Sequence, residues 1–130
     1  METIDGLCVL GRSTMLTSLE KAVLDMMLDK PGERFEVIRR QLACATVSER
    51  RFSGVGFFTD LVVPIDAAVQ RDLPNMEIGD VVAEFPSVQH GAGFVLFIRN
   101  GVVRMLEGYT YDEPWPENTD EFSLKRYAAA

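Results

Sequence analysis

The chain has few of the residues that most often carry enzyme chemistry. Among 130 residues there are two cysteines and one histidine. Cys8 and Cys44 lack a CxxC spacing and are too few for a disulfide framework, so they predict reduced, packed thiols. One histidine and two unspaced cysteines cannot supply a standard zinc site. The sequence therefore predicts no bound metal and no cofactor.

Long apolar runs and basic residues are also scarce. No stretch reaches the ~20 apolar residues of a membrane-spanning helix, and the N-terminus lacks the basic and apolar regions of a secretory signal. We therefore expect a cytoplasmic protein without membrane contact. Lysine and arginine number 13 against 20 acidic residues, a net charge of −7. This balance predicts no nucleic-acid binding and favours a basic protein as partner.

The clearest structural signal is a β-hairpin near the C-terminus. Asn100-Gly101 stands between two apolar runs, and both residues tolerate the positive φ of a type I′ turn. The run Phe94–Ile98 is apolar at every position, which is typical of a strand covered on both faces. We therefore expect this strand in the middle of a sheet.

The first third of the chain has the spacing of helices. One begins at Ser13-Thr14, or slightly later at Thr17, which forms a capping box with Glu20. Pro31-Gly32 ends that helix, and a second runs from about residue 33 to residue 43. So short a link predicts an antiparallel helical hairpin.

The rest of the chain reads as strands with short connections. Besides the two hairpin strands, apolar runs predict strands at residues 46–52, 56–63 and 81–85, with an irregular stretch at 65–79. The connections are too short for parallel crossovers. The predicted fold class is α+β, a single domain over residues 1–130 with an ordered core at about 13–122. A two-helix hairpin packs on a curled antiparallel sheet of about five strands, and residues 128–130 fray.

Two helices cover only one face of such a sheet. Val95, Phe97, Val103 and Met105 must then meet a folded-over part of the sheet or a second copy of the chain, because soluble monomers rarely expose large apolar patches. We expect a homodimer, with a half-barrel within one chain as the alternative.

Candidate catalytic residues are isolated in the sequence. His90 lies in a glycine-flanked loop suited to a general base, but no nucleophile accompanies it at a recognised spacing. Glu84 and Glu107 would form an acid–base pair if their strands were neighbours. Gly54-Val55-Gly56 lacks the third glycine and the helix of a phosphate loop, and predicts a close backbone approach instead. No catalytic residue is predicted.

The segment from Glu107 onward combines aromatic and acidic residues. Tyr109, Tyr111 and Trp115 stand among acids, with no base between Arg104 and Lys125. Tyrosine and tryptophan are enriched at binding surfaces, so the segment predicts an acidic aromatic surface. The alternative is that Trp115, between two prolines, folds back over the edge of the core.

Four segments resemble a group of small uncharacterised bacterial proteins. These are GVGFFT at 54–59, HGAGF at 90–94, LEGYTY at 106–111 and Trp115-Pro116, and the resemblance covers roughly residues 15–117. It implies a bacterial cytosolic protein with a helical N-terminal third, and it brings no activity or site residue. Small acidic α+β proteins include immunity partners of toxins, which is an analogy of size and charge.

Two functions follow as expectations. The first is a non-enzymatic cytosolic interaction module, immunity- or inhibitor-like, that contacts a basic protein. The alternative is a small-molecule-binding or hydrolytic protein with a pocket between sheet and helices. The candidate binding residues are His90, Glu107, Tyr109, Tyr111 and Trp115, and in the alternative the first three lie at the pocket mouth.

Overall fold

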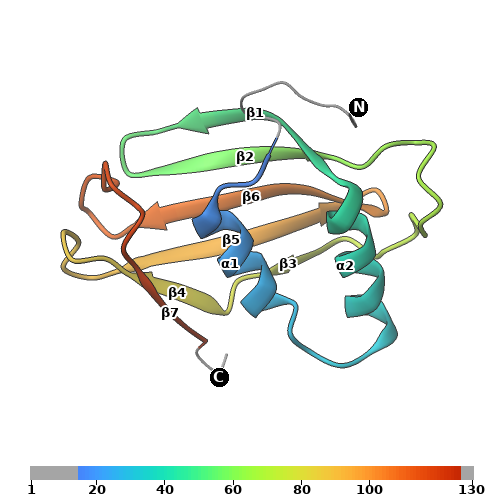
Figure 1. Ribbon diagram of the computed structural model, residues 1–130, viewed down its shortest axis with the longest axis horizontal. Coiled ribbons are helices and arrows are strands. Elements are labelled where there is room, and N and C mark those ends of the chain that lie inside the picture. The colour runs from blue at the N-terminus through green and yellow to red at the C-terminus, as the bar shows by residue number, and fades with distance from the viewer. Residues whose placement is uncertain (1–14, 127–130) are drawn as a thin grey trace.

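The computed structural model describes residues 15–126, shown in Figure 1. Within this range the chain is α+β, as the sequence predicts. The helices are α1 (Ser18–Met27) and α2 (Glu33–Cys44), and the strands are β1 (Thr46–Phe52), β2 (Gly56–Val62), β3 (Met76–Ile78), β4 (Val81–Glu84), β5 (Ala92–Arg99), β6 (Val102–Thr110) and β7 (Ser123–Arg126). Cys8, the helix start at Ser13-Thr14 and the alanines at 128–130 lie outside the described residues.

The strands form one antiparallel sheet in the order β1-β2-β6-β5-β4-β7, and β3 pairs with β5 beside β4. The prediction of about five strands is wrong, because the sheet has seven. The missed strands are β3 and β7, which have three and four residues. The expected central position of Phe94–Ile98 is confirmed, since β5 lies between β6 and the pair β3 and β4.

The hairpin between β5 and β6 has the predicted turn. Asn100 and Gly101 have φ values of 55° and 87°, as a type I′ turn requires. A Cβ atom on Gly101 would lie 1.8 Å from the carbonyl oxygen of Arg71. The buried amide of Gln41 in α2 donates to the Gly101 carbonyl at 3.0 Å and accepts the N–H of Val103 at 2.8 Å. The turn is therefore tied to α2.

Helix α1 starts at the later of the two predicted positions. The Thr17 hydroxyl accepts the N–H of Glu20 at 3.1 Å, and the Glu20 carboxylate accepts the N–H of Thr17 at 2.9 Å. This is the predicted capping box. The helix ends at Met27, and Gly32 with φ 116° precedes α2.

The Glu20 carboxylate also joins α1 to the sheet. It accepts two hydrogen bonds from the Arg50 guanidinium of β1, at 2.8 and 3.0 Å, and one from the Thr59 hydroxyl of β2. Glu20 and Thr59 are almost completely buried. A buried charge is tolerated when it is paired and fully hydrogen-bonded, and this carboxylate is both.

The two faces of the sheet differ in their cover. Figure 1 shows α1 and α2 on the same side of the sheet. Along β5 the buried residues Phe94, Leu96 and Ile98 alternate with the half-buried Val95 and Phe97, and alternate residues of a strand point to opposite faces. The buried set belongs to the core beneath the helices. We call the other side the uncovered face, since no helix among residues 15–126 lies on it.

A β-bulge determines which face of the sheet the side chains at the start of β6 point to. Phe97 pairs with Met105, and Ile98 pairs with Val103, so Arg104 is an extra residue. Met105 thus shares the uncovered face with Phe97, whereas Val103 turns toward the helices and is completely buried. The expectation that Val103 needs external cover is wrong.

The predicted close approach at Gly54-Val55-Gly56 is confirmed. A Cβ atom on Gly56 would lie 2.0 Å from the carbonyl oxygen of Gly108 in β6, so only glycine fits there. The carbonyl of Gly54 accepts the N–H of Trp115 at 2.8 Å. The acidic C-terminal segment is thereby anchored to the start of β2.

Candidate interaction surface

The candidate binding residues lie in three places. Glu107 and Tyr109 are half-buried residues of β6 on the uncovered face. His90 and Tyr111 line a pocket beside the loop between β4 and β5. Trp115 packs against the core. The rings of Tyr109 and Tyr111 meet edge to face at 5.5 Å, so the loop pocket adjoins the uncovered face.

Trp115 covers the edge of the core, which is the alternative left open by the sequence. Its ring centroid lies 5.1 Å from that of Phe57, in an edge-on contact. Phe85 and Phe94 lie at 5.7 and 6.3 Å. Edge-on aromatic contacts at these distances stabilise a core beyond the area they bury. Of the three aromatic residues in the segment, Tyr109 and Trp115 are half-buried, whereas Tyr111 is 44% exposed.

The loop pocket has a volume of about 510 Å³, and its lining includes Glu84, His90, Tyr111 and Lys125. Lys125 and Glu84 form an exposed ion pair at 3.1 Å. No serine or cysteine lines the pocket, so His90 has no nucleophile to activate there. The hypothesis of neighbouring strands for Glu84 and Glu107 is wrong, because β5 lies between β4 and β6.

Glu113 holds the His90 loop in place. Its carboxylate accepts the backbone N–H groups of Gln89 and His90, each at 2.9 Å. These two hydrogen bonds favour the ionised form and hold the pKa of Glu113 below its usual value, with a smaller contribution from the charge of His90. The loop conformation therefore depends on an ionised Glu113.

Acidification should release this loop. Because the pKa of Glu113 is lower in the folded than in the unfolded state, its stabilising effect is present above the unfolded pKa and is lost as pH falls through the folded pKa. In an NMR titration, the amide signals of Gln89 and His90 should move together, with a midpoint below that of an ordinary glutamate. Glu113→Gln should abolish this transition, and Glu117→Gln should not. A midpoint at the ordinary value would contradict the prediction.

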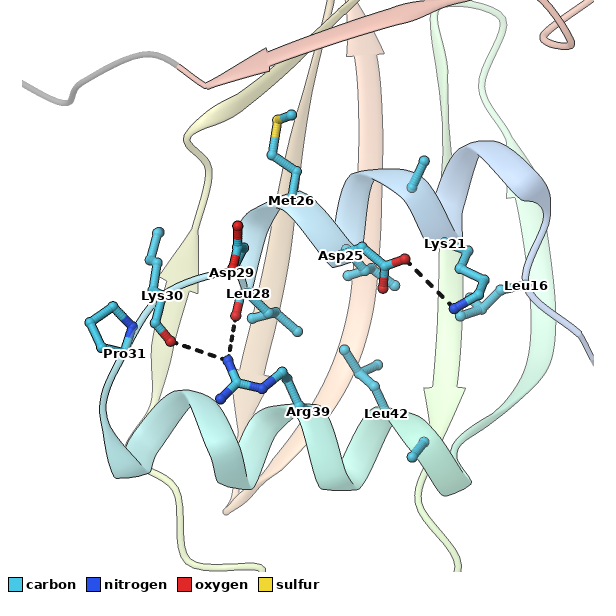
Figure 2. A pocket seen from close by; sticks show the side chains of 13 residues that line it. Leu16, Lys21, Asp25, Met26, Leu28, Asp29, Lys30, Pro31, Arg39 and Leu42 are labelled. Atoms are coloured by element: carbon cyan, nitrogen blue, oxygen red, sulfur yellow. Dashed lines mark hydrogen bonds and ion pairs between the residues drawn. The ribbon is translucent and has the colours of Figure 1, made fainter.

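A second hollow lies between the outer sides of α1 and α2 (Figure 2). It has a volume of about 1010 Å³, and leucines of both helices contribute to its lining. Arg39 of α2 donates to the carbonyls of Leu28 and Lys30 just after α1, where helix carbonyls lack partners. Lys21 and Asp25 pair along α1 at 3.6 Å. Lys21, Asp25 and Arg39 of this groove thus bind within the fold.

The uncovered face carries a continuous strip of large side chains from three neighbouring strands. Across the β2–β6–β5 pairing, Glu107 stands opposite Phe58 on one side and Val95 on the other, and Met105 stands opposite Phe97. Side chains opposite each other in an antiparallel sheet are in contact range. We call the following half-buried residues the apolar strip: Phe58, Val95, Phe97, Met105 and Tyr109.

Three of the cations around the apolar strip already have a carboxylate partner; a fourth, Arg104 beside Met105 in β6, is exposed and forms no ion pair among residues 15–126. The ion pairs are Arg51–Asp60 at 2.9 Å, Arg99–Glu77 and Lys125–Glu84 at 3.1 Å. The Arg51 guanidinium also lies 5.3 Å from the ring centre of Phe58. The Arg99 guanidinium lies 5.5 Å from the ring centre of Phe97. A carboxylate holds each of these three cations in place, and each of the two arginines also contacts an aromatic ring.

Glu107 differs from the other acids of this face. It is half-buried, and burial alone raises its pKa. Among residues 15–126 its carboxylate makes no hydrogen bond and no ion pair. Met105 and Tyr109 flank it along β6, while Phe58 and Val95 flank it across the sheet. An unpaired carboxylate thus stands in the middle of the apolar strip.

The described part of the chain contains neither a metal-ligand cluster nor a helix that could span a membrane. No group of three or more metal-ligating side chains occurs among residues 15–126. None of the helices in that range is long and apolar enough to cross a membrane. Comparison of the chain with known protein families, curated proteins and solved structures finds no match.

Sequence reasoning found part of this surface. It named Glu107 and Tyr109 as binding residues, and it recognised that Val95, Phe97 and Met105 lack helical cover. It missed Phe58 and the isolation of Glu107. The alternation of buried and half-buried residues in β2 is too weak a signal in the sequence, where Phe57 and Phe58 are adjacent.

Proposed function

We propose that this chain is a non-enzymatic protein-interaction module that docks a basic protein on its uncovered face. The observation that carries the proposal is the apolar strip, which continues across three strands without helical cover. Apolar patches on a folded domain mark interaction sites. Aromatic residues and methionine, which make up most of the strip, are enriched at the cores of protein interfaces.

The charge of the chain supports a basic partner. The net charge is −7, and such a field accelerates association with a positively charged protein. Tyr111 extends this surface beyond the strip through its contact with Tyr109. The proposed docking surface therefore includes Glu107, Tyr109 and Tyr111 from the sequence prediction. It leaves out Trp115.

A paired-variant capture experiment tests this function. Phe97→Ser with Met105→Ser makes the strip polar, and Ile65→Ser makes the same kind of change at a loop residue that is 89% exposed. Each tagged protein is incubated with lysate of the native host at low and high salt, and captured proteins are quantified by mass spectrometry. We expect basic proteins that bind the wild type and Ile65→Ser, but not the strip variant, and that bind more weakly at high salt.

Capture that is equal for all three proteins would contradict the proposal. Circular dichroism of the strip variant must match the wild type, so that lost binding is not lost folding. The rival function is small-molecule binding, but its site differs from the expected pocket between sheet and helices, because Glu107 and Tyr109 lie on the uncovered face and do not share a pocket with His90. The rival rests instead on the convergence of His90, Glu84 and Tyr111 at the loop pocket. It predicts ligands whose binding is lost in His90→Ala and kept in the strip variant.

A further inference from the structure

Glu107 is a half-buried acid of the uncovered face that forms no ion pair and no hydrogen bond among residues 15–126. Glu107 stands between Phe58 and Val95 across the sheet, and between Met105 and Tyr109 along its own strand. Arg51, the cation of β1 nearest to this region of the sheet, is bound to Asp60 at 2.9 Å. Among residues 15–126 the carboxylate therefore has apolar and aromatic neighbours and no polar partner.

Docking would change the surroundings of Glu107. A partner that covers the apolar strip removes the remaining water from the carboxylate, and an unpaired charge in such a place strongly opposes binding. A partner that brings a cation to this point instead gains a charge-assisted hydrogen bond in an environment that excludes water. The same carboxylate thus penalises one class of partner and favours another, which is how specificity arises.

We propose that Glu107 selects a partner that presents a single lysine or arginine, flanked by apolar side chains, to the centre of the uncovered face. This inference rests on the proposed function and names the partner's recognition chemistry. One cation suffices, because the other half-buried acid near the strip, Asp60, is already paired. The apolar flanks match the apolar strip on either side of Glu107.

A second copy of the chain fits this surface less well. A two-fold axis through the centre of the uncovered face would bring two Glu107 carboxylates together, and like charges at an interface oppose association. Two arginines of this face, Arg51 and Arg99, are held by Asp60 and Glu77 and are not free to neutralise them. Self-association through this face is therefore an outcome of the test that would overturn the proposal.

Selection from a library of random displayed peptides tests the chemistry without a known partner. The full chain is the bait in three forms: wild type, Glu107→Gln and Glu84→Gln. Glu84 is the matched control, because it lies on the same face, is exposed and pairs with Lys125. We expect peptides selected by the wild type and by Glu84→Gln to share one basic residue among apolar ones. Peptides selected by Glu107→Gln should lack that basic residue.

Affinity measurements then isolate the ion pair. A peptide selected by the wild type should bind Glu107→Gln about tenfold more weakly, because one charge-assisted contact is lost. Glu84→Gln should bind it within about twofold of the wild type, as expected for an exposed rim charge. Replacing the peptide's basic residue with methionine should weaken binding to the wild type by a similar factor, and should leave the affinity for Glu107→Gln unchanged.

The unfolding temperature supplies a readout that separates recognition from a structural role. Burial raises the folded pKa of Glu107, so the charge carries a penalty in the free protein that is fully present above that pKa and disappears as pH falls toward the unfolded value. The other ionisable groups in this part of the sheet are Glu49, Arg51, Asp60, Arg104 and Tyr109. We expect Glu107→Gln at neutral pH to unfold at the same or a higher temperature than the wild type, although it binds more weakly.

Several results would overturn the inference. If Glu107→Gln retains the affinity while Phe97→Ser abolishes it, the selective role of Glu107 falls and the proposed function stands. If neither change affects binding, or if no peptide is enriched, both fall. A stable dimer in light scattering that Phe97→Ser dissociates would assign the face to a second copy. A lower unfolding temperature for Glu107→Gln would make Glu107 a structural residue.

Discussion

Replacing Glu20 with alanine is expected to lower the free energy of unfolding by about 3–5 kcal/mol. The Glu20 carboxylate is buried and accepts hydrogen bonds from Arg50, Thr59 and the backbone of Thr17. Its removal leaves the Arg50 guanidinium, only 15% exposed, without a counter-ion. Urea unfolding followed by circular dichroism measures the loss.

Two control variants separate the contributions. Thr17→Ala removes the other half of the capping box and should cost about 1 kcal/mol. Glu36→Ala breaks the exposed pair with Arg40 on α2 and should cost less than about 1 kcal/mol. If Glu20→Ala costs no more than Thr17→Ala, the ion pair with Arg50 contributes nothing and the prediction is wrong. Glu20→Leu combined with Arg50→Met should recover part of the loss, because no buried charge then remains unpaired.

The behaviour of Glu20 illustrates what sequence reasoning can find. Its bond to Thr17 spans three residues and has a recognised sequence pattern, so the capping box was predictable. Its pairing with Arg50 joins residues thirty positions apart and depends on where β1 packs beneath α1. The same limit applies to Asn100-Gly101, whose turn type was predictable, whereas its bond to Gln41 was not.

The missed strands have a similar physical cause. The three residues of β3 and the four of β7 are too short to show an alternating pattern. They form strands because β5 and β4 offer unpaired edges to which they can hydrogen-bond. Tertiary context of this kind overrides local propensity. The bulge at Arg104 was likewise not predictable from local sequence. Its one extra residue places the Val103 side chain on the other side of the sheet from the expected one.

The candidate site was predictable in its residue types more than in its geometry. Glu107 and Tyr109 attract attention because acids and aromatic residues gather there in the sequence. That they face away from the helices follows from the register of β6 with β2 and β5. Trp115 shows the reverse case, because its composition suggests a binding residue while its ring packs against Phe57. Only the sheet register and the path of the C-terminal segment distinguish the two outcomes.

Adjacent residues of β5 provide a stability test of the two-faced sheet. Leu96 is completely buried beneath the helices, and Leu96→Ala should lower the free energy of unfolding by about 2–5 kcal/mol, since it removes apolar contacts and leaves a cavity. Phe97 is larger but half-buried on the uncovered face. Phe97→Ala should therefore cost only about 1 kcal/mol, in proportion to the smaller area removed from water.

If Phe97→Ala lowers the free energy of unfolding by more than expected, the dependence on protein concentration identifies the cause. In a monomer the losses in the free energy of unfolding caused by Leu96→Ala and by Phe97→Ala are both independent of protein concentration. If a second copy covers the uncovered face, the unfolding midpoint of the wild type rises with concentration, and Phe97→Ala removes that dependence while Leu96→Ala retains it. Urea unfolding at two widely separated concentrations measures both quantities. A cost for Phe97→Ala equal to that for Leu96→Ala, without any concentration dependence, would mean that part of the same chain covers this face, and it would contradict the docking surface proposed here.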